Sequence, residues 1–134
     1  MKRYWSLMSL AGVIAAIGLA DGVGQWTVAG QNPQNTWSAP GEGQLGPSNV
    51  ASLAVKWVLT TGGDVSATPT VAGNAVYVPD WAGNLYAIQR DTGQPIWRAQ
   101  VPQLDGVPGA VTRVSPAVHG GDVIIGDNLW GCVL

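Results

Sequence analysis

One pattern of residues occurs twice in this chain of 134 residues. The segment 69–80 (PTVAGNAVYVPD) aligns with 116–127 at an offset of 47, and five positions are identical: Pro, Val, Gly, Val and Asp. Trp57 and Trp97 are 40 residues apart, and the second copy has seven extra residues within 101–112. Without those residues the period is 40. A repeat of this length predicts one supersecondary unit that is used more than once.

The repeat unit contains short β runs separated by turn residues. Each run is rich in β-branched or aromatic types, which suits strands buried on one face. The predicted strands are 54–60, 69–72, 75–79, 85–89 and 95–100. The 19 glycines and 9 prolines are too many for a helical bundle, and 46% hydrophobic residues are too many for a disordered chain. Four short strands in about 40 residues match a β-propeller blade. The sequence therefore predicts an all-β fold, a partial β-propeller of the first two to three blades.

The N-terminus has the pattern of a secretory leader. Lys2 and Arg3 precede an apolar run at 7–20, and Gly18 and Ala20 are small residues that suit cleavage after Ala20. The alternative, a retained anchor, is disfavoured because the run is shorter than the ~20 residues that a span needs. We therefore expect a periplasmic or secreted protein with no membrane span after cleavage. The predicted organisation is a signal peptide at 1–20, an extended segment at 21–53 and incomplete propeller repeats at 54–134.

Charge and cysteine content exclude several classes of partner and site. The formal net charge is −2, which disfavours nucleic acid as a partner. Cys132 is the only cysteine, so the chain has no intrachain disulfide, no C-x-x-C metal site and no C-x-x-C-H haem attachment, and we interpret Cys132 as incidental. Asp80 and Asp127 occupy equivalent repeat positions and are predicted to cap turns, while His119 is expected in a solvated loop.

The segment 87–97 carries a resemblance. Its sequence, AIQRDTGQPIW, resembles the A-x-D-x-x-T-G-x-x-x-W docking motif of pyrroloquinoline quinone (PQQ) propeller proteins, with Gln89 in place of the usual Asp. The resemblance implies that Thr92, Gly93 and Trp97 take part in locking one blade to the next. Glycine permits the tight turn, and an indole offers a large surface for burial. The alternative is a tryptophan packed in some other β-sandwich.

A wider resemblance runs from Trp26 to Asp127. This stretch is similar to the start of polyvinyl alcohol dehydrogenase-type quinoproteins, a subgroup of the PQQ alcohol dehydrogenases, whereas the tail at 128–134 departs from the expected continuation. The resemblance implies PQQ and calcium as cofactors, an alcohol or polymer substrate and a cytochrome c acceptor. In the family, the catalytic base and calcium ligands lie in later blades. We therefore expect an N-terminal fragment that is inactive alone and holds no catalytic residue.

The same resemblance identifies candidate cofactor residues. Arg113, within a Val-Thr-Arg-Val-Ser-Pro stretch, matches a family arginine that contacts PQQ, and a guanidinium can bind a carboxylate in bidentate fashion. A surface arginine is the alternative. Ser66 stands where relatives often have a cofactor-binding Glu, and Asp64 could substitute for it or simply belong to a common Gly-Gly-Asp turn. Val107 and Pro108 replace a vicinal cysteine pair, which disfavours the methanol-oxidising branch.

A non-enzymatic function remains open at this stage. Some PQQ-like propellers bind no quinone and act as scaffolds in outer-membrane protein assembly. Such scaffolds usually carry a lipidated cysteine after the leader, and this chain has none there. A carbohydrate- or peptide-binding propeller is a third possibility, although no specific residue supports it.

Overall fold

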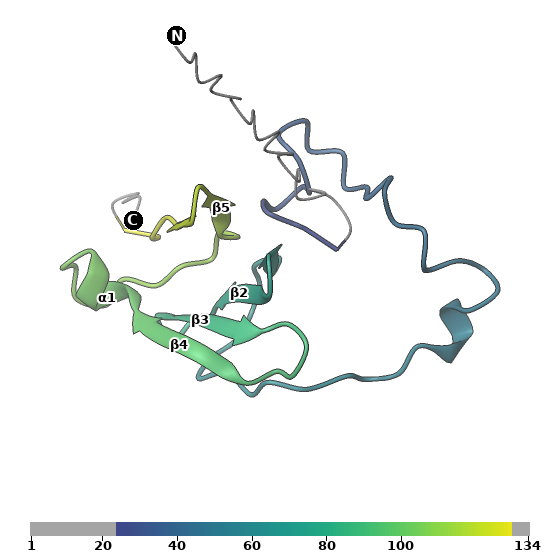
Figure 1. Ribbon diagram of the computed structural model, residues 1–134. Helices are drawn as coiled ribbons and strands as arrows, with labels where there is room; N and C mark the ends of the chain where they lie inside the picture. The colour runs from purple at the N-terminus through teal and green to yellow at the C-terminus, as the bar shows by residue number, and fades with distance from the viewer. Residues whose placement is uncertain (1–23, 130–134) are drawn as a thin grey trace, which may run out of the picture.

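The computed structural model describes residues 24–129 (Figure 1). The predicted leader and Cys132 lie outside the described residues. Short strands make up most of the regular structure, together with one turn of 3-10 helix and a four-residue helix. The elements are η1 Val50–Ser52, β1 Thr70–Ala72, β2 Ala75–Pro79, β3 Asn84–Gln89, β4 Pro95–Gln100, α1 Val101–Leu104, β5 Ala117–His119 and β6 Asp122–Ile124. No helix within 24–129 is long and apolar enough to cross a membrane.

Four consecutive antiparallel strands form the first sheet, in the order β1-β2-β3-β4. Val71 pairs with Val76, and Ala87 of β3 pairs with Trp97 of β4. The central strand β3 is buried along almost its whole length, whereas β4 is the exposed edge. This up-and-down arrangement of four short strands is that of one propeller blade, as predicted.

The second sheet repeats the beginning of the first. It consists of β5 and β6, and its pairs Ala117↔Ile124, Val118↔Val123 and His119↔Asp122 lie 47 residues after the three pairs of β1 and β2. Sequence identity across the two copies therefore corresponds to identical strand register. This confirms the prediction of an all-β, partial β-propeller: one blade and the first two strands of the next.

Directional bonds join the two sheets. The backbone N–H of Thr68 donates to Ser115 Oγ at 2.9 Å, and Thr70 Oγ1 donates to the Pro116 carbonyl. An N-terminal segment crosses both sheets, because Trp26 forms an antiparallel bridge with Val71 and the Thr27 carbonyl accepts the Val118 N–H at 2.9 Å. Neighbouring repeats are thus joined by hydrogen bonds.

The predicted strand at 54–60 is wrong. These residues belong to no strand or sheet of the described chain, although they pass close to the first sheet. Trp57 and Leu59 pack against the core residues Val78, Tyr86 and Ile88. In Figure 1 the segment that carries η1 makes a wide loop away from the sheets before it returns alongside the end of β3.

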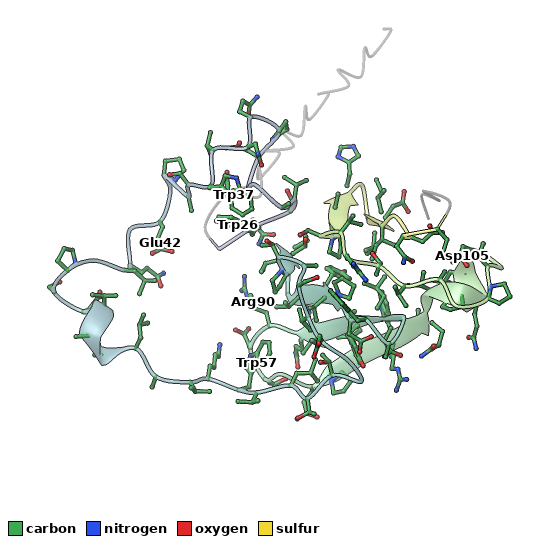
Figure 2. All side chains as sticks on the ribbon, turned by 180° about the vertical axis from the view of Figure 1, so that it is seen from behind. Trp26, Trp37, Glu42, Trp57, Arg90 and Asp105 are labelled. Carbon is green, nitrogen blue, oxygen red and sulfur yellow. The ribbon has the colours of Figure 1, made fainter. Side chains whose placement is uncertain are left out.

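Trp57 docks on the Thr92-Gly93 turn. Its Nε1–H donates to the Arg90 carbonyl at 2.8 Å, and its indole lies so close that a Cβ built on Gly93 would be 2.6 Å from Trp57 Cγ. Gly93 also has a φ of +73°. Figure 2 shows Trp57 beside Arg90 at this turn. The tryptophan on this turn therefore comes from one repeat earlier than Trp97, which instead contacts Tyr77 with ring centroids 5.9 Å apart.

A buried carboxylate organises the turn between β2 and β3. Asp80 is fully buried, and its Oδ1 accepts the N–H groups of Ala82 and Asn84 at 3.0 and 2.9 Å. Its Oδ2 accepts the Gly62 N–H at 2.8 Å and the Tyr86 hydroxyl at 2.9 Å. The Asn84 amide donates to both oxygens of Asp80. The prediction that Asp80 caps a turn is confirmed, and the same carboxylate also fixes the loop around Gly62.

These hydrogen bonds set the charge state of the carboxylate. Burial alone would raise the pKa of Asp80, but the hydrogen bonds from Asn84, Tyr86 and Gly62 outweigh it and hold the pKa below its ordinary value of 3.8. Burial raises the pKa of Tyr86, and the neighbouring carboxylate raises it further, so the phenol stays a proton donor. Asn84 extends the network to β4, because its Oδ1 accepts from Arg98 Nε at 2.9 Å and from Gln100 Nε2.

We expect Gly93→Ala to destabilise the fold more than Gly73→Ala. Both glycines have positive φ, so each substitution costs about 1–2 kcal/mol of backbone strain. A methyl group at Gly73 meets open space, whereas one at Gly93 collides with Trp57 and adds about 1–3 kcal/mol. Urea unfolding of the two variants measures the difference. Equal losses would mean that the indole does not hold this turn.

We expect Asp80→Asn to lower the free energy of unfolding by about 1.5–3 kcal/mol at neutral pH, because an amide cannot accept all the donors that face it. Since folding lowers the pKa of Asp80, the folded protein binds this proton less readily than the unfolded chain. The stabilisation is therefore complete above the unfolded pKa and is lost as the pH falls through the folded pKa. The difference between wild type and variant should shrink below about pH 4.

Chemical denaturation at a series of pH values checks this. Asp122→Asn is the matched control, because Asp122 is exposed on β6, and it should change stability by less than about 0.5 kcal/mol. A wild-type advantage over Asp80→Asn that stays constant down to pH 2 would contradict the assigned role.

Candidate functional site

Three segments meet around the exposed indole of Trp81, in the turn between β2 and β3. The Arg113 guanidinium carbon lies 3.9 Å from the centroid of the Trp81 ring. Trp81 Nε1–H donates to Ser66 Oγ at 2.8 Å, and the Trp81 backbone N–H donates to the Asp64 carbonyl at 2.9 Å. The structure therefore brings together both predicted cofactor-binding residues, Arg113 and Asp64, at a tryptophan that they share.

The loop 62–64 packs against the turn that carries Trp81 only because positions 62 and 63 are glycines. A Cβ on Gly63 would lie 2.7 Å from the backbone nitrogen of Ala82, and one on Gly62 would lie 2.9 Å from Asn84 Nδ2. Backbone at these two positions therefore reaches the Asp80 turn more closely than any residue with a side chain could. This close approach places the Asp64 carbonyl within hydrogen-bond distance of the Trp81 backbone N–H. The Gly-Gly-Asp sequence is a requirement of packing at the site.

Arg113 is held from the other copy of the repeat. The preceding residue, Thr112, is buried and donates its hydroxyl to the Gly126 carbonyl at 2.6 Å. Val111 and Asn128 form two hydrogen bonds. The Val111 N–H donates to Asn128 Oδ1 at 3.1 Å, and the Asn128 N–H donates to the Val111 carbonyl at 3.0 Å. The backbone that carries Arg113 is therefore anchored to the segment that follows β6.

Among residues 24–129, no carboxylate forms an ion pair with Arg113. In the part of the chain that the structure describes, the ion pairs are Lys56–Asp91 and Arg90–Asp91, and neither involves the site. The Arg113 side chain is exposed. The N–H donors of a guanidinium lie in one plane. A carboxylate approaching in that plane would meet two parallel donors.

Asp64 contributes its backbone to the site. Its carbonyl holds Trp81, while the residue itself is exposed to solvent. Ser66 also acts on Trp81, because its hydroxyl oxygen accepts the Trp81 Nε1–H. Both residues therefore support the aromatic ring, and a direct contact of the Asp64 carboxylate with a ligand stays a prediction.

The residues fit one part of the cofactor that the sequence resemblance implies. PQQ is a flat tricyclic quinone with three carboxylates, so its site needs cationic groups. Arg113 supplies an exposed, oriented and unneutralised cation of this kind. Calcium is different: among residues 24–129 there is no group of three or more His, Cys, Asp or Glu that could hold a metal ion. The described residues thus include one cationic group that can contact a carboxylate, and they assign no calcium ligands.

The other residues singled out in the sequence lie in turns, in a hairpin and in a loop. Asp127 Oδ1 accepts the Leu129 N–H at 2.8 Å, the same two-residue turn that Asp80 forms with Ala82, so its predicted capping role is confirmed. Thr92 Oγ1 donates to Gln89 Oε1 at 2.7 Å, within the turn on which Trp57 lies. His119 is exposed at the β5–β6 hairpin, and Val107 and Pro108 lie in the loop after α1.

Sequence reasoning missed Trp81. It lies outside the predicted strands, in an Asp-Trp-Ala-Gly-Asn turn where no hydrophobic periodicity applies. Its side chain is 40% exposed, so burial in the core does not account for its presence. A large aromatic residue in a glycine-containing turn was the available signal.

This chain aligns with only a small part of each of the similar proteins described below. A tetrathionate hydrolase of Acidithiobacillus ferrooxidans is 33% identical over 51 residues, which are 38% of this chain and 10% of that protein. A europium-containing methanol dehydrogenase structure aligns with 56% of this chain and 15% of its own, at 20% identity and a TM-score of 0.49. A quinohemoprotein alcohol dehydrogenase from Comamonas testosteroni aligns with 78% of this chain and 23% of its own, at 21% identity and a TM-score of 0.46. The chain spans less than a quarter of each of these proteins.

A sequence model of one protein family covers most of the chain. It matches residues 10–131 and therefore includes both copies of the repeat, the Thr-Gly turn and the segment that carries Arg113. Its description is outer membrane protein assembly factor BamB. The chain belongs to this family of PQQ-type repeat proteins.

Proposed function

We propose that this chain forms part of the cofactor wall of an exported PQQ-dependent alcohol dehydrogenase. The observation that carries the proposal is the guanidinium of Arg113, which is exposed, has its carbon 3.9 Å from the Trp81 ring centroid and has no acidic partner within the described chain. Membership of a PQQ-type repeat family supports it. The substrate class in this proposal is a secondary alcohol of the polyvinyl alcohol type.

Each residue of the site has a defined part in the proposal. Arg113 binds a carboxylate of the quinone through its in-plane N–H donors. Trp81 shields one face of the guanidinium from water, and Ser66 and the Asp64 carbonyl hold Trp81. PQQ, when bound, supplies the two-electron acceptor for alcohol oxidation. The proposal assigns to the described residues the binding and orientation of the cofactor only.

The remaining parts of the proposal come from the sequence resemblance. The segment 1–20 is proposed to direct export, so that the protein works in the periplasm or outside the cell. Calcium is proposed as a second cofactor, and a cytochrome c as the electron acceptor. None of these involves a residue of the site described above.

A second candidate function is a scaffold in outer-membrane protein assembly. The observation that favours it is the description of the family, which names an assembly factor. A scaffold has no need of a cation kept free for a small-molecule carboxylate. Measurement of PQQ binding therefore separates the two candidates directly.

We expect the purified chain to bind PQQ saturably in equilibrium dialysis with calcium present, followed by absorbance of the quinone. Arg113→Ala should weaken binding about 10- to 100-fold, because it removes a charge-assisted hydrogen-bonded pair worth about 1.5–3 kcal/mol.

Arg90→Ala is the matched control, because Arg90 is a partly exposed arginine that lies away from Trp81, beside Asp91. Its PQQ affinity should stay within twofold of wild type. Equal losses in both variants would indicate non-specific attraction of the anionic quinone. Absence of saturable binding would favour the scaffold function.

A further inference from the structure

Trp81 is held more firmly than an exposed side chain requires. The residue is 40% exposed, yet two hydrogen bonds fix it, one from Nε1 to Ser66 Oγ and one from the backbone N–H to the Asp64 carbonyl. The turn that carries it is also locked by Asp80 from inside the protein. An indole fixed at both its backbone and its ring nitrogen presents one face in a constant orientation. That face is occupied by Arg113.

The contact between Trp81 and Arg113 joins two copies of the repeat. Trp81 belongs to the first sheet, in the turn between β2 and β3, whereas the Arg113 segment is anchored beside β6 of the second copy through Thr112 and Val111. The guanidinium is therefore oriented by an element other than its own. A side chain with this much rotamer freedom would otherwise sample many directions in solvent.

We propose that Trp81 is a positioning residue that fixes the plane of the Arg113 guanidinium, so that its paired donors are preset for a planar carboxylate. The proposal rests on the proposed function of the site as a quinone-binding wall and adds to it the residue that sets the geometry of recognition. Ser66 acts on Arg113 indirectly, because its hydroxyl oxygen accepts the Trp81 Nε1–H and so fixes the ring.

The proposal predicts which side chains can replace each other. Trp81→Phe keeps a ring face for the guanidinium but loses the bond to Ser66, so it should retain part of the effect. Trp81→Leu removes the ring face and releases the guanidinium. Arg113→Lys keeps the charge but has no fork of donors, so charge alone would not restore binding.

The stack can be tested in the free protein by nuclear magnetic resonance. Arg113 Nε–H should show an upfield ring-current shift, and Arg113→Lys identifies its signal by removing it. We expect Trp81→Leu to abolish the shift and Trp81→Phe to retain part of it. A signal unchanged in Trp81→Leu would overturn the positioning role.

PQQ affinity measured in the same proteins tests the consequence for binding. We expect Trp81→Leu to weaken binding about two- to fivefold, the scale of an exposed cation–π contact, with a smaller loss for Trp81→Phe. Trp37→Leu is the matched control, because Trp37 is 57% exposed and packs against Trp26, away from the site. Urea unfolding of all variants reports any loss of fold separately.

These measurements separate a failure of the positioning role from a failure of the proposed function. If wild type binds PQQ and Trp81→Leu binds it equally well, the positioning role is wrong and the proposed function stands. If wild type does not bind PQQ but the Arg113 signal moves in Trp81→Leu, the proposed function is wrong, while Trp81 still orients the guanidinium. A loss of affinity in Trp81→Leu with no loss in the Trp37 control supports both.

Discussion

The buried carboxylate of Asp80 is the interaction on which the rest of this structure depends. It accepts hydrogen bonds from its own turn, from Gly62 before the sheet and from Tyr86 within β3, so that three separate parts of the chain converge on two oxygen atoms. An ionised carboxylate can be buried at acceptable cost only when donors surround it. The bond from Gly62 to this carboxylate fixes the loop 62–64, whose Asp64 carbonyl accepts the Trp81 backbone N–H. The site at the surface therefore depends on a polar group in the interior.

Neighbouring repeats are joined by directional contacts that supplement a small apolar core. The buried cluster contains Val78, Tyr86 and Ile88, with Trp57 and Leu59 packed against it. In repeat folds each unit is stabilised mainly by contacts with its neighbours. Here these contacts include the hydroxyl bonds across to Ser115 and Pro116, the Trp26 bridge and the indole of Trp57 on Gly93. Directional bonds fix the alignment of neighbouring units as well as the distance between them.

The sequence was informative where structure is local and uninformative where it depends on distant partners. The β1–β2 and β5–β6 hairpins were predictable because β-branched runs flank a turn that contains glycine. The segment 54–60 has the same composition, yet a strand exists only where another strand pairs with it, and composition cannot supply that partner. Capping by Asp80 was predictable from its repeat position, whereas its bond to Gly62 joins residues 18 apart. Trp81 had no periodic signal because it lies in a turn.

The division of the site between two copies of the repeat has a thermodynamic consequence. Trp81 is fixed within the first sheet, and the Arg113 segment is anchored beside the second, so their stack exists only when the copies keep their relative position. A ligand that binds the oriented guanidinium binds the assembled arrangement and not the separated one. Mass action then requires that such a ligand stabilise the contact between repeats by the same free energy that the contact contributes to binding. In the proposed site, recognition of a carboxylate and packing of adjacent blades are therefore coupled through one aromatic ring.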